Sequence, residues 1–252
     1  MKLKGKIAVI TGAGAGYGMS RGFPTAYAKE GANLVLNYYR DDPDMMDELK
    51  KELEGYGSRV ILAEGDISKP EVAQNLIETA IENFGRVDIL LNVAGISNPK
   101  LLVDMTLEDW NRMLEVDLTS AFLTCKYAVP YMIKQKFGRI INLSSQIAQK
   151  GSVEHCHYGA AKAGLIGFTK SLAREVGQYN ITVNCIAPGP IETQLMGVVS
   201  PEWRRQKESE LVLPRFGELE EILPTAVFLA AEPDGNLYTG QTLGPNLGDV
   251  MI

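Results

Sequence analysis

The chain has 252 residues, a formal net charge of -6, 45% hydrophobic residues and 22% charged residues. This composition is typical of a globular protein with one substantial core, and the acidic balance argues against a nucleic-acid partner, which needs a basic surface. No apolar run reaches the ~18 residues of a membrane-spanning helix and no signal peptide precedes the first predicted strand, so we expect no membrane partner.

Short apolar runs alternate with helical segments along the chain. Because the runs are mostly apolar, we expect strands that are buried on both faces, as in a parallel sheet. The alternation predicts an α/β fold, with residues 1–252 forming a single doubly wound Rossmann domain: a seven-stranded parallel sheet with helices on both faces. Ser68 to Glu71 and Thr106 to Asp109 fit a helix-capping pattern. The predicted strands are Lys6 to Thr11, Asn33 to Tyr38, Arg59 to Glu64, Val87 to Val93, Arg139 to Leu143, Thr182 to Ile186 and Gln241 to Leu243.

A glycine-rich turn follows the first predicted strand. Thr11 to Gly18 contains four glycines and leads into a helical stretch that is rich in alanine. Glycine lets the backbone approach a pyrophosphate closely, and free N–H groups at the start of a helix attract its negative charge. We therefore predict a nucleotide-binding turn in preference to a flexible surface loop.

A second motif has the residues of a proton-transfer site. Tyr158 and Lys162 stand four residues apart, and Ser145 lies thirteen residues before the tyrosine. A four-residue step places both side chains on one face of a helix, where an ammonium favours the ionised form of a neighbouring phenol. Such a tyrosine is suited to general acid–base catalysis. The spacing alone is common in helices, so the prediction depends on the accompanying motifs.

In order and approximate spacing, these motifs resemble the short-chain dehydrogenase/reductase family over nearly the whole chain. Further matches are Asp66 after the third strand, Asn92 to Gly95 after the fourth and Asn184 to Pro190 after the sixth. The resemblance implies that Tyr158 is the acid/base, that Ser145 hydrogen-bonds the substrate oxygen and that Lys162 holds the nicotinamide ribose. It also implies that Asp66 contacts the adenine and that Pro188 to Thr193 line the nicotinamide. The expected cofactor-binding residues are Gly12, Gly16, Gly18, Met19, Arg40, Asp66, Ile67, Asn92, Ala94, Gly95, Lys162, Pro188, Gly189, Ile191 and Thr193.

The glycine turn departs from the family pattern in its length. Gly31 lies twenty positions after Thr11, two more than is usual in the family. We expect an extended turn in which Gly18-Met19-Ser20 takes the place of the usual last glycines, as in certain enoyl reductases and bile-acid dehydrogenases. Pro24 would then lie in the first turn of the following helix, where proline is tolerated.

Asp117 is a second departure, because the family usually has an asparagine there that supports a water chain to the lysine. An aspartate lacks the donor amide, but its charge could pair with Lys162 and alter proton transfer at Tyr158. Either Asp117 tunes the reaction or it is a harmless near-isostere. We include it with Ser145, Tyr158 and Lys162 among the predicted catalytic residues. Val93 likewise replaces a common second asparagine.

The end of the second strand bears on the choice of cofactor. An acidic residue at position 38 would select the 2′-hydroxyl of NAD, but this chain has Tyr38 there. Arg40 is close enough in sequence to pair with the 2′-phosphate of NADP. NADP is therefore favoured. NAD stays open, because Asp41 and Asp42 could neutralise Arg40, and because Arg40 could instead be a solvated surface charge.

The remaining features concern metals, the substrate side and assembly. His155-Cys156-His157 is too compact for three converging ligands and the chain has no other histidine, so we predict no metal site. Either these residues and Gln146 line the substrate pocket, or they cap the helix start. The segment from about 190 to 217, which includes Trp203, corresponds in the family to a lid that excludes water. The apolar C-terminus and the resemblance indicate a homo-oligomer, commonly a tetramer in this family. Cys125, Cys156 and Cys185 have no paired spacing, which favours a cytoplasmic location.

The predicted function is that of an NAD(P)-dependent oxidoreductase. It would transfer hydride reversibly between the nicotinamide and a small-molecule carbonyl or secondary alcohol, with Tyr158 as acid/base. One alternative is a nucleotide sensor or scaffold without turnover, for which Asp117 argues mildly. Another is a different reaction such as enoyl reduction, against which the position of Ser145 argues. There is a general resemblance to 3-oxoacyl-carrier-protein reductases, but specificity depends on variable loops, so the substrate is left open.

Overall fold

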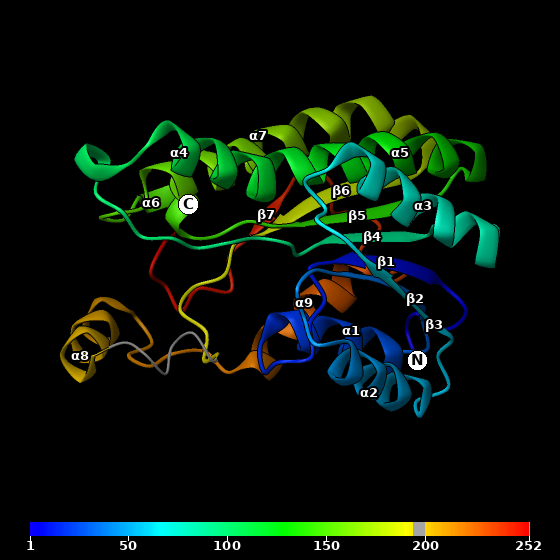
Figure 1. Cartoon of the computed structure of the whole chain (residues 1–252), viewed down its shortest axis with the longest axis horizontal. Helices are drawn as coiled ribbons and strands as arrows, with labels where there is room; N and C mark the ends of the chain where they lie inside the picture. Colours follow the sequence, from blue (N-terminus) through cyan, green and yellow to red (C-terminus); the bar gives the residue numbers. More distant parts are fainter. Residues whose placement is uncertain (194–199, 252) are drawn as a thin grey trace.

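The computed structural model describes residues 1–193 and 200–251. Seven strands form one parallel sheet in the order β3-β2-β1-β4-β5-β6-β7 (Figure 1). Every predicted strand is present and its ends differ by two residues at most, so the predicted doubly wound fold is confirmed. The strands are β1 (Ile7–Thr11), β2 (Asn33–Tyr38), β3 (Val60–Glu64), β4 (Ile89–Asn92), β5 (Gly138–Leu143), β6 (Ile181–Ile186) and β7 (Thr242–Leu243).

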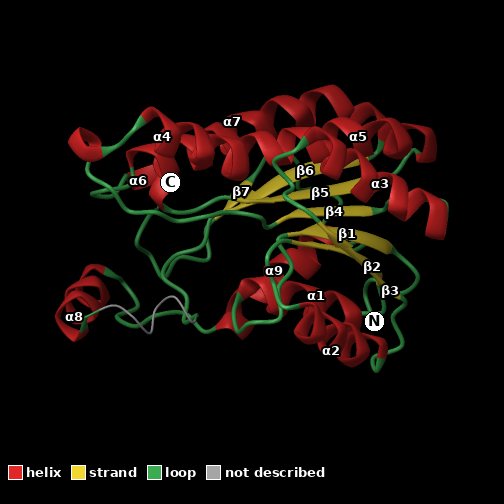
Figure 2. Cartoon of the chain, viewed as in Figure 1, coloured by secondary structure: helices red, strands yellow, loops and turns green. Residues whose placement is uncertain are grey.

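Helices cover both faces of the sheet (Figure 2). One face carries α1 (Met19–Lys29), α2 (Pro43–Glu54) and α9 (Leu219–Ala230), and the other carries α3 (Pro70–Phe84), α5 (Ser120–Gln135) and α7 (Cys156–Val176). Shorter elements are η1 (Leu102–Asp104), α4 (Leu107–Leu114), the π-helical turn η2 (Glu115–Thr119), α6 (Ile147–Lys150), η3 (Gly177–Tyr179) and α8 (Pro201–Glu210). Within the described ranges, no helix is both long and apolar enough to cross a membrane.

The central strands contribute to a hydrophobic core on each face of the sheet. Val9 and Leu90 pack with the core on the α3 and α5 side, and Ile10 and Leu91 with the core on the α1 and α9 side. Successive side chains of a strand point to opposite faces, so a strand covered on both faces is apolar throughout. The edge strand β3 differs, because only its first residue is fully buried and its last is exposed. The expectation of burial on both faces was therefore wrong for β3, and also for β7, whose two residues are only partly buried; each of these strands has a neighbour on one side only.

One of the two predicted helix caps is present. Thr106 Oγ1 accepts the N–H of Asp109 and the Asp109 carboxylate accepts the N–H of Thr106, which is a capping box at the start of α4. The second prediction was wrong, because Lys69 is the N-cap of α3 and makes no side-chain cap. Ser68 instead donates its hydroxyl to Asp66 Oδ1 at 2.7 Å, so it supports the segment that follows β3.

The chain adds β2 and β3 on one side of β1 and then β4 to β7 on the other side, so β1 pairs with both β2 and β4. In an open parallel sheet a crevice forms beyond the carboxyl ends of the strands at this point. The glycine turn, Asp66 and Asn92 come at or directly after the ends of β1, β3 and β4, and Ser145 and Pro188 follow β5 and β6. All these motifs therefore lie at one edge of the sheet.

Candidate active site

A cleft of about 620 Å³ opens at the carboxyl ends of β1 to β4. It brings together nine of the fifteen residues predicted to bind the cofactor, while the other six do not line it. The lining residues are Gly12, Gly16, Gly18, Met19, Asp66, Ile67, Ala94, Gly95 and Thr193, and the others are Arg40, Asn92, Lys162, Pro188, Gly189 and Ile191.

The start of the glycine turn is packed against the loop that follows β4. Gly12 has φ +65°, and a Cβ placed on it would lie 2.6 Å from Ala94 Cα, so only glycine fits without movement of the backbone. Thr11 Oγ1 accepts the N–H groups of Val93 and Ala94 at 3.1 and 3.2 Å. The floor of the cleft is thus formed by two backbone segments in direct contact.

The end of the turn presents backbone donors. Among the described residues, no acceptor lies within hydrogen-bonding reach of the N–H groups of Gly16, Gly18 and Met19. All three residues line the cleft, and α1 begins at Met19, so the positive end of its dipole faces the same space. Free donors at a helix start are what a pyrophosphate needs, so the residues present fit a dinucleotide.

The position of Pro24 corrects one expectation. Although α1 starts directly after Gly18, in agreement with an extended turn, Pro24 is the sixth residue of α1 and not in its first turn. A proline inside a helix cannot donate to the carbonyl four residues earlier. Here that carbonyl, on Ser20, accepts the N–H of Gly14 at 3.2 Å, so no backbone acceptor is lost.

Lys162 and Asp117 form a buried charged pair next to the cleft. The ammonium lies 3.1 Å from Asp117 Oδ2 and donates to the carbonyl of Leu143 at 3.0 Å. Burial by itself lowers the pKa of Lys162, but the charge of Asp117 and the neighbouring Tyr158 outweigh burial and hold that pKa above its ordinary value. The lysine is therefore a cation at neutral pH despite being buried.

Tyr158 lies on the same face of α7 as Lys162, as the four-residue spacing predicts. Lys162 Nζ lies 5.6 Å from the centroid of the Tyr158 ring, and the tyrosine is half-buried. Ser145 is buried and its Oγ accepts the N–H of Ile147 at 3.2 Å. Neither Ser145 nor Tyr158 lines the 620 Å³ cleft, whereas Leu143, which accepts from Lys162, does.

The side chain of Asn92 is turned away from the cleft and into the protein. Its Nδ2 donates to Asn142 Oδ1 and its Oδ1 accepts from Thr124, both at 2.8 Å. These contacts tie β4 to β5 and α5. Any contact of Asn92 with a ligand would therefore come from its backbone.

Asp41, and not Arg40, reaches the glycine turn. Arg40 is exposed, has φ +61° and stacks its guanidinium 4.9 Å from the ring centroid of Tyr39. Tyr39 and Asp41 both line the cleft, and Asp41 Oδ2 would lie 3.3 Å from a Cβ placed on Gly14. The sequence alone does not tell which of Tyr39, Arg40 and Asp41 faces the cleft, because this depends on the left-handed backbone at Arg40.

Arg112 is a cleft residue that sequence reasoning missed. It comes from α4 and places Nη2 at 2.9 Å from Asp66 Oδ2 and Nη1 at 2.9 Å from Ser68 Oγ. Asp66 therefore has a fixed orientation in the cleft, where burial raises its pKa but the bonds from Ser68 and Arg112 outweigh burial and lower it. No local sequence pattern indicates that α4 contacts the loop that follows β3.

The structure describes only part of the region predicted to contact the substrate. Of the predicted lid, residues 194–199 lie outside the described residues, and α8 follows with Trp203 edge-on to Phe216 at 6.2 Å. His155 is the N-cap residue of α7, as the capping alternative predicts, but its side chain makes no capping hydrogen bond. His157 is fully buried and Gln146 is buried, so neither presents an open wall to a substrate in this structure.

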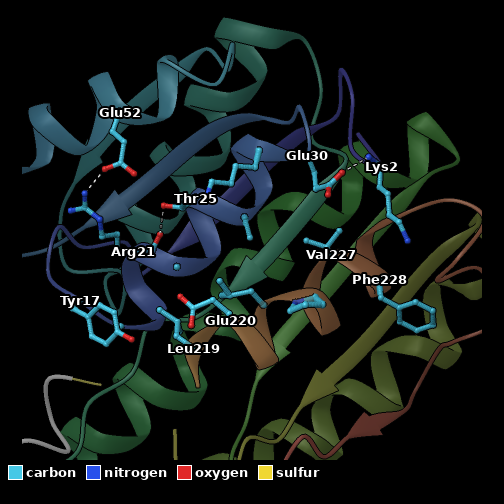
Figure 3. A pocket seen from close by; sticks show the side chains of 16 residues that line it. Lys2, Tyr17, Arg21, Thr25, Glu30, Glu52, Leu219, Glu220, Val227 and Phe228 are labelled. Atoms are coloured by element: carbon cyan, nitrogen blue, oxygen red, sulfur yellow. Dashed lines mark hydrogen bonds and ion pairs between the residues drawn. The ribbon is translucent and has the colours of Figure 1, made fainter. Parts of the chain in front are cut away.

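A second cavity, of about 510 Å³, lies between α1 and α9 on the outer side of the glycine turn (Figure 3). Tyr17 and Gly18 line both this cavity and the 620 Å³ cleft. Arg21 lines only the outer cavity, where it reaches toward Glu52 of α2. The end of the glycine turn therefore lies between the two spaces.

Comparison with known proteins agrees with this architecture. Residues 12–248 match the family model described as Enoyl-(Acyl carrier protein) reductase. The chain is 36% identical over 251 residues to the 3-oxoacyl-[acyl-carrier-protein] reductase FabG of Thermotoga maritima, with 100% of both chains covered. It is also 36% identical over 250 residues to the 3-oxoacyl-[acyl-carrier-protein] reductase of Synechocystis sp., with 99% of each covered.

A solved short-chain dehydrogenase/reductase from Serratia marcescens superposes with a TM-score of 0.90 at 28% identity, covering 99% of each chain. The chain therefore belongs to the short-chain dehydrogenase/reductase family and is an NAD(P)-dependent oxidoreductase acting on CH–OH or C=O groups.

Proposed function

We propose that this oxidoreductase reduces a ketone with NADPH as the favoured cofactor, and that Tyr158 protonates the carbonyl oxygen. The observation that carries the proposal is the Lys162 ammonium, 5.6 Å from the Tyr158 ring centroid and paired with Asp117. A buried cation at this distance stabilises negative charge on the phenol and on the substrate oxygen during proton transfer. Ser145 polarises the same oxygen. The bound nicotinamide supplies the hydride.

In this proposal each group of predicted residues, inside the cleft or beside it, contacts one part of the dinucleotide. The glycine turn, with Gly12, Gly16, Gly18 and Met19, takes the pyrophosphate, because its free N–H groups face the cleft. The adenine lies against Asp66 and Ile67, and the middle of the dinucleotide against Asn92, Ala94 and Gly95. Lys162 holds the nicotinamide ribose, and Pro188, Gly189, Ile191 and Thr193 line the nicotinamide.

The preference for NADP over NAD is supported by two features at the end of β2. Tyr38 stands where an acidic residue would select NAD, and Arg40 stacks on Tyr39, a residue of the cleft wall. Asp41 opposes a 2′-phosphate, because its carboxylate lies against the glycine turn. We therefore propose a modest preference for NADP, with NAD as a usable cofactor.

The substrate class is proposed from the relatives. Two relatives that match this chain over at least 99% of its length are named 3-oxoacyl-[acyl-carrier-protein] reductases. A 3-oxoacyl thioester is therefore the first ketone to test. Oxidation of NADPH followed by absorbance should occur with acetoacetyl-CoA and not with crotonoyl-CoA. Turnover of crotonoyl-CoA alone would instead support the enoyl-reductase alternative. Binding of NADPH without turnover across a ketone panel would support the sensor or scaffold alternative.

We also propose a cytoplasmic homotetramer. Cys125, Cys156 and Cys185 are free thiols, and the first and last of them are buried, which suits a reducing compartment. The exposed Met251 near the C-terminus is available for contact with another subunit. Light scattering on the purified protein would measure the assembly directly, and a monomer would refute it.

A further inference from the structure

Backbone groups of three consecutive residues in the glycine turn are each held by a different residue, one from β2 and two from α1. The N–H of Ala13 donates to the carbonyl of Asn37 at 2.8 Å, and the N–H of Gly14 donates to the carbonyl of Ser20 at 3.2 Å. The carbonyl of Ala15 accepts from Arg21 Nη1 at 2.7 Å. The extended turn is therefore fixed by β2 on one side and by the first residues of α1 on the other.

Pro24 makes the second of these bonds available. In a regular helix the carbonyl of Ser20 would accept the N–H of residue 24. Proline has no N–H, so this carbonyl stays free to bind Gly14. One hydrogen bond inside α1 is therefore missing, and the Ser20 carbonyl that would have accepted it binds the glycine turn instead.

Arg21 supplies the third bond, and its own position is fixed from outside. Its second guanidinium nitrogen pairs with Glu52 of α2, and about a third of each side chain is exposed, at 37% and 35% (Figure 3). Because a guanidinium is planar and rigid, the contact with Glu52 sets the direction from which Nη1 meets Ala15.

The bond to Ala15 also sets the direction of the next N–H group. In a trans peptide, the C=O of Ala15 and the N–H of Gly16 point in opposite directions. Arg21 lies on the wall of the outer cavity and not on the cleft, whereas Gly16 lines the cleft. Holding the carbonyl toward Arg21 therefore turns the N–H of Gly16 toward the cleft.

We infer that Arg21 is a positioning residue for cofactor binding, which aims the backbone donors of the turn at the pyrophosphate without touching it. The inference rests on the proposed function, since it assumes that the cleft holds a dinucleotide. It differs from that proposal in assigning a role to a residue outside the cleft. The effect should be confined to ligands that contain the pyrophosphate.

The test compares two fragments of the cofactor on Arg21→Ala, Arg21→Lys and the control Arg59→Ala. Arg59 is a matched control, because it also donates to a backbone carbonyl, that of Asn83 at 3.0 Å, and lies away from the turn. Affinities for ADP-ribose and adenosine are measured by calorimetry and by NMR titration. For Arg21→Ala we expect ADP-ribose to bind about tenfold more weakly, which corresponds to about 1.4 kcal/mol.

The other readouts separate positioning from general damage to the fold. Arg21→Ala should bind adenosine within about twofold of the parent, and raise KM for NADPH about tenfold with kcat nearly unchanged. Arg21→Lys should bind ADP-ribose with an affinity between those of the parent and of Arg21→Ala. An ammonium can reach either Ala15 or Glu52, but it lacks the forked guanidinium that contacts both. Arg59→Ala should match the parent in every assay. Should Arg21→Ala not fold, Glu52→Gln should show the same selective loss for ADP-ribose at a smaller size.

Equal weakening of both fragments, or unchanged affinity for ADP-ribose, would overturn the inference. A fall in kcat at saturating NADPH with unchanged KM would also overturn it. If the parent protein bound neither ADP-ribose nor NADPH, the proposed dinucleotide site itself would be refuted. That failure is separate, because it is visible without any variant.

Discussion

Asp117 and Lys162 form an ion pair inside the protein, 3.1 Å apart, with both side chains at most 4% exposed. The same carboxylate accepts the N–H of Ile96 at 2.8 Å. Gly95 packs directly on the pair, since a Cβ placed there would lie 2.9 Å from Asp117 Oδ2 and 3.2 Å from Lys162 Nζ. The pair therefore supports both the charge beside Tyr158 and the loop that lines the 620 Å³ cleft.

Removing the carboxylate should destabilise the fold. In Asp117→Ala the buried ammonium has lost its counter-charge, which should lower the free energy of unfolding by about 3–5 kcal/mol. Asp117→Asn should lose less, because the amide oxygen can still accept from Ile96. Chemical denaturation of both variants measures the difference. Unfolding of Asp117→Ala at the parental denaturant concentration would show that the pair does not stabilise the protein.

The pair also predicts a dependence on pH. Because the folded protein raises the pKa of Lys162, the stabilisation is complete below the ordinary lysine pKa of about 10.4 and is lost as the pH rises through the higher folded value. Asp117→Asn removes the negative charge that raises the pKa of Lys162, so the stability of this variant should begin to fall at a lower pH than in the parent. The alkaline limb of kcat/KM should also move to lower pH. Measurement from roughly pH 7 to 11 tests this. Coincident profiles for parent and variant would remove any tuning role for Asp117.

Gly12 should tolerate no side chain, unlike another glycine with a left-handed backbone. Gly57 has φ +92° with nothing within 4 Å of an added Cβ, so Gly57→Ala should cost only backbone strain, about 1–2 kcal/mol. Gly12→Ala adds the collision with Ala94, about 1–3 kcal/mol more, and should also weaken NADPH binding. Thermal unfolding and fluorescence titration compare the two. Equal losses in both variants would mean that the close approach of the two backbones is unimportant.

Asp41 should limit the use of NADP. Asp41→Asn should raise the ratio of kcat/KM for NADPH to that for NADH by about tenfold, since a like charge near the 2′-phosphate is removed. Arg40→Ala should lower that ratio. Asp42→Asn is the control, because Asp42 caps α2 through Asp44 N–H at 2.9 Å and asparagine caps equally well. If Asp42→Asn changed the ratio as much as Asp41→Asn, the effect would reflect net charge and not position.

The sequence predicts the sheet and the common edge of the motifs, because buried parallel strands are apolar throughout and each motif follows a strand. It does not predict which of Arg40 and Asp41 faces the cleft, since that depends on the left-handed backbone at Arg40. Nor does it predict Arg112, which meets Asp66 only through packing of α4 beside the loop after β3. The prediction that Pro24 lies in the first turn of α1 was wrong. Pro24 is tolerated later in the helix because the Ser20 carbonyl accepts the N–H of Gly14, a contact that no local sequence pattern reveals.

Tyr158→Phe tests the central claim most directly, because it keeps the ring beside Lys162 and removes only the hydroxyl. The measurement is kcat for reduction of acetoacetyl-CoA at saturating NADPH, with NADPH affinity measured in parallel. The proposed acid/base role predicts that kcat falls by about a hundredfold or more while NADPH binds as in the parent. Reduction by Tyr158→Phe at the parental rate would contradict the role of this tyrosine and with it the proposed mechanism.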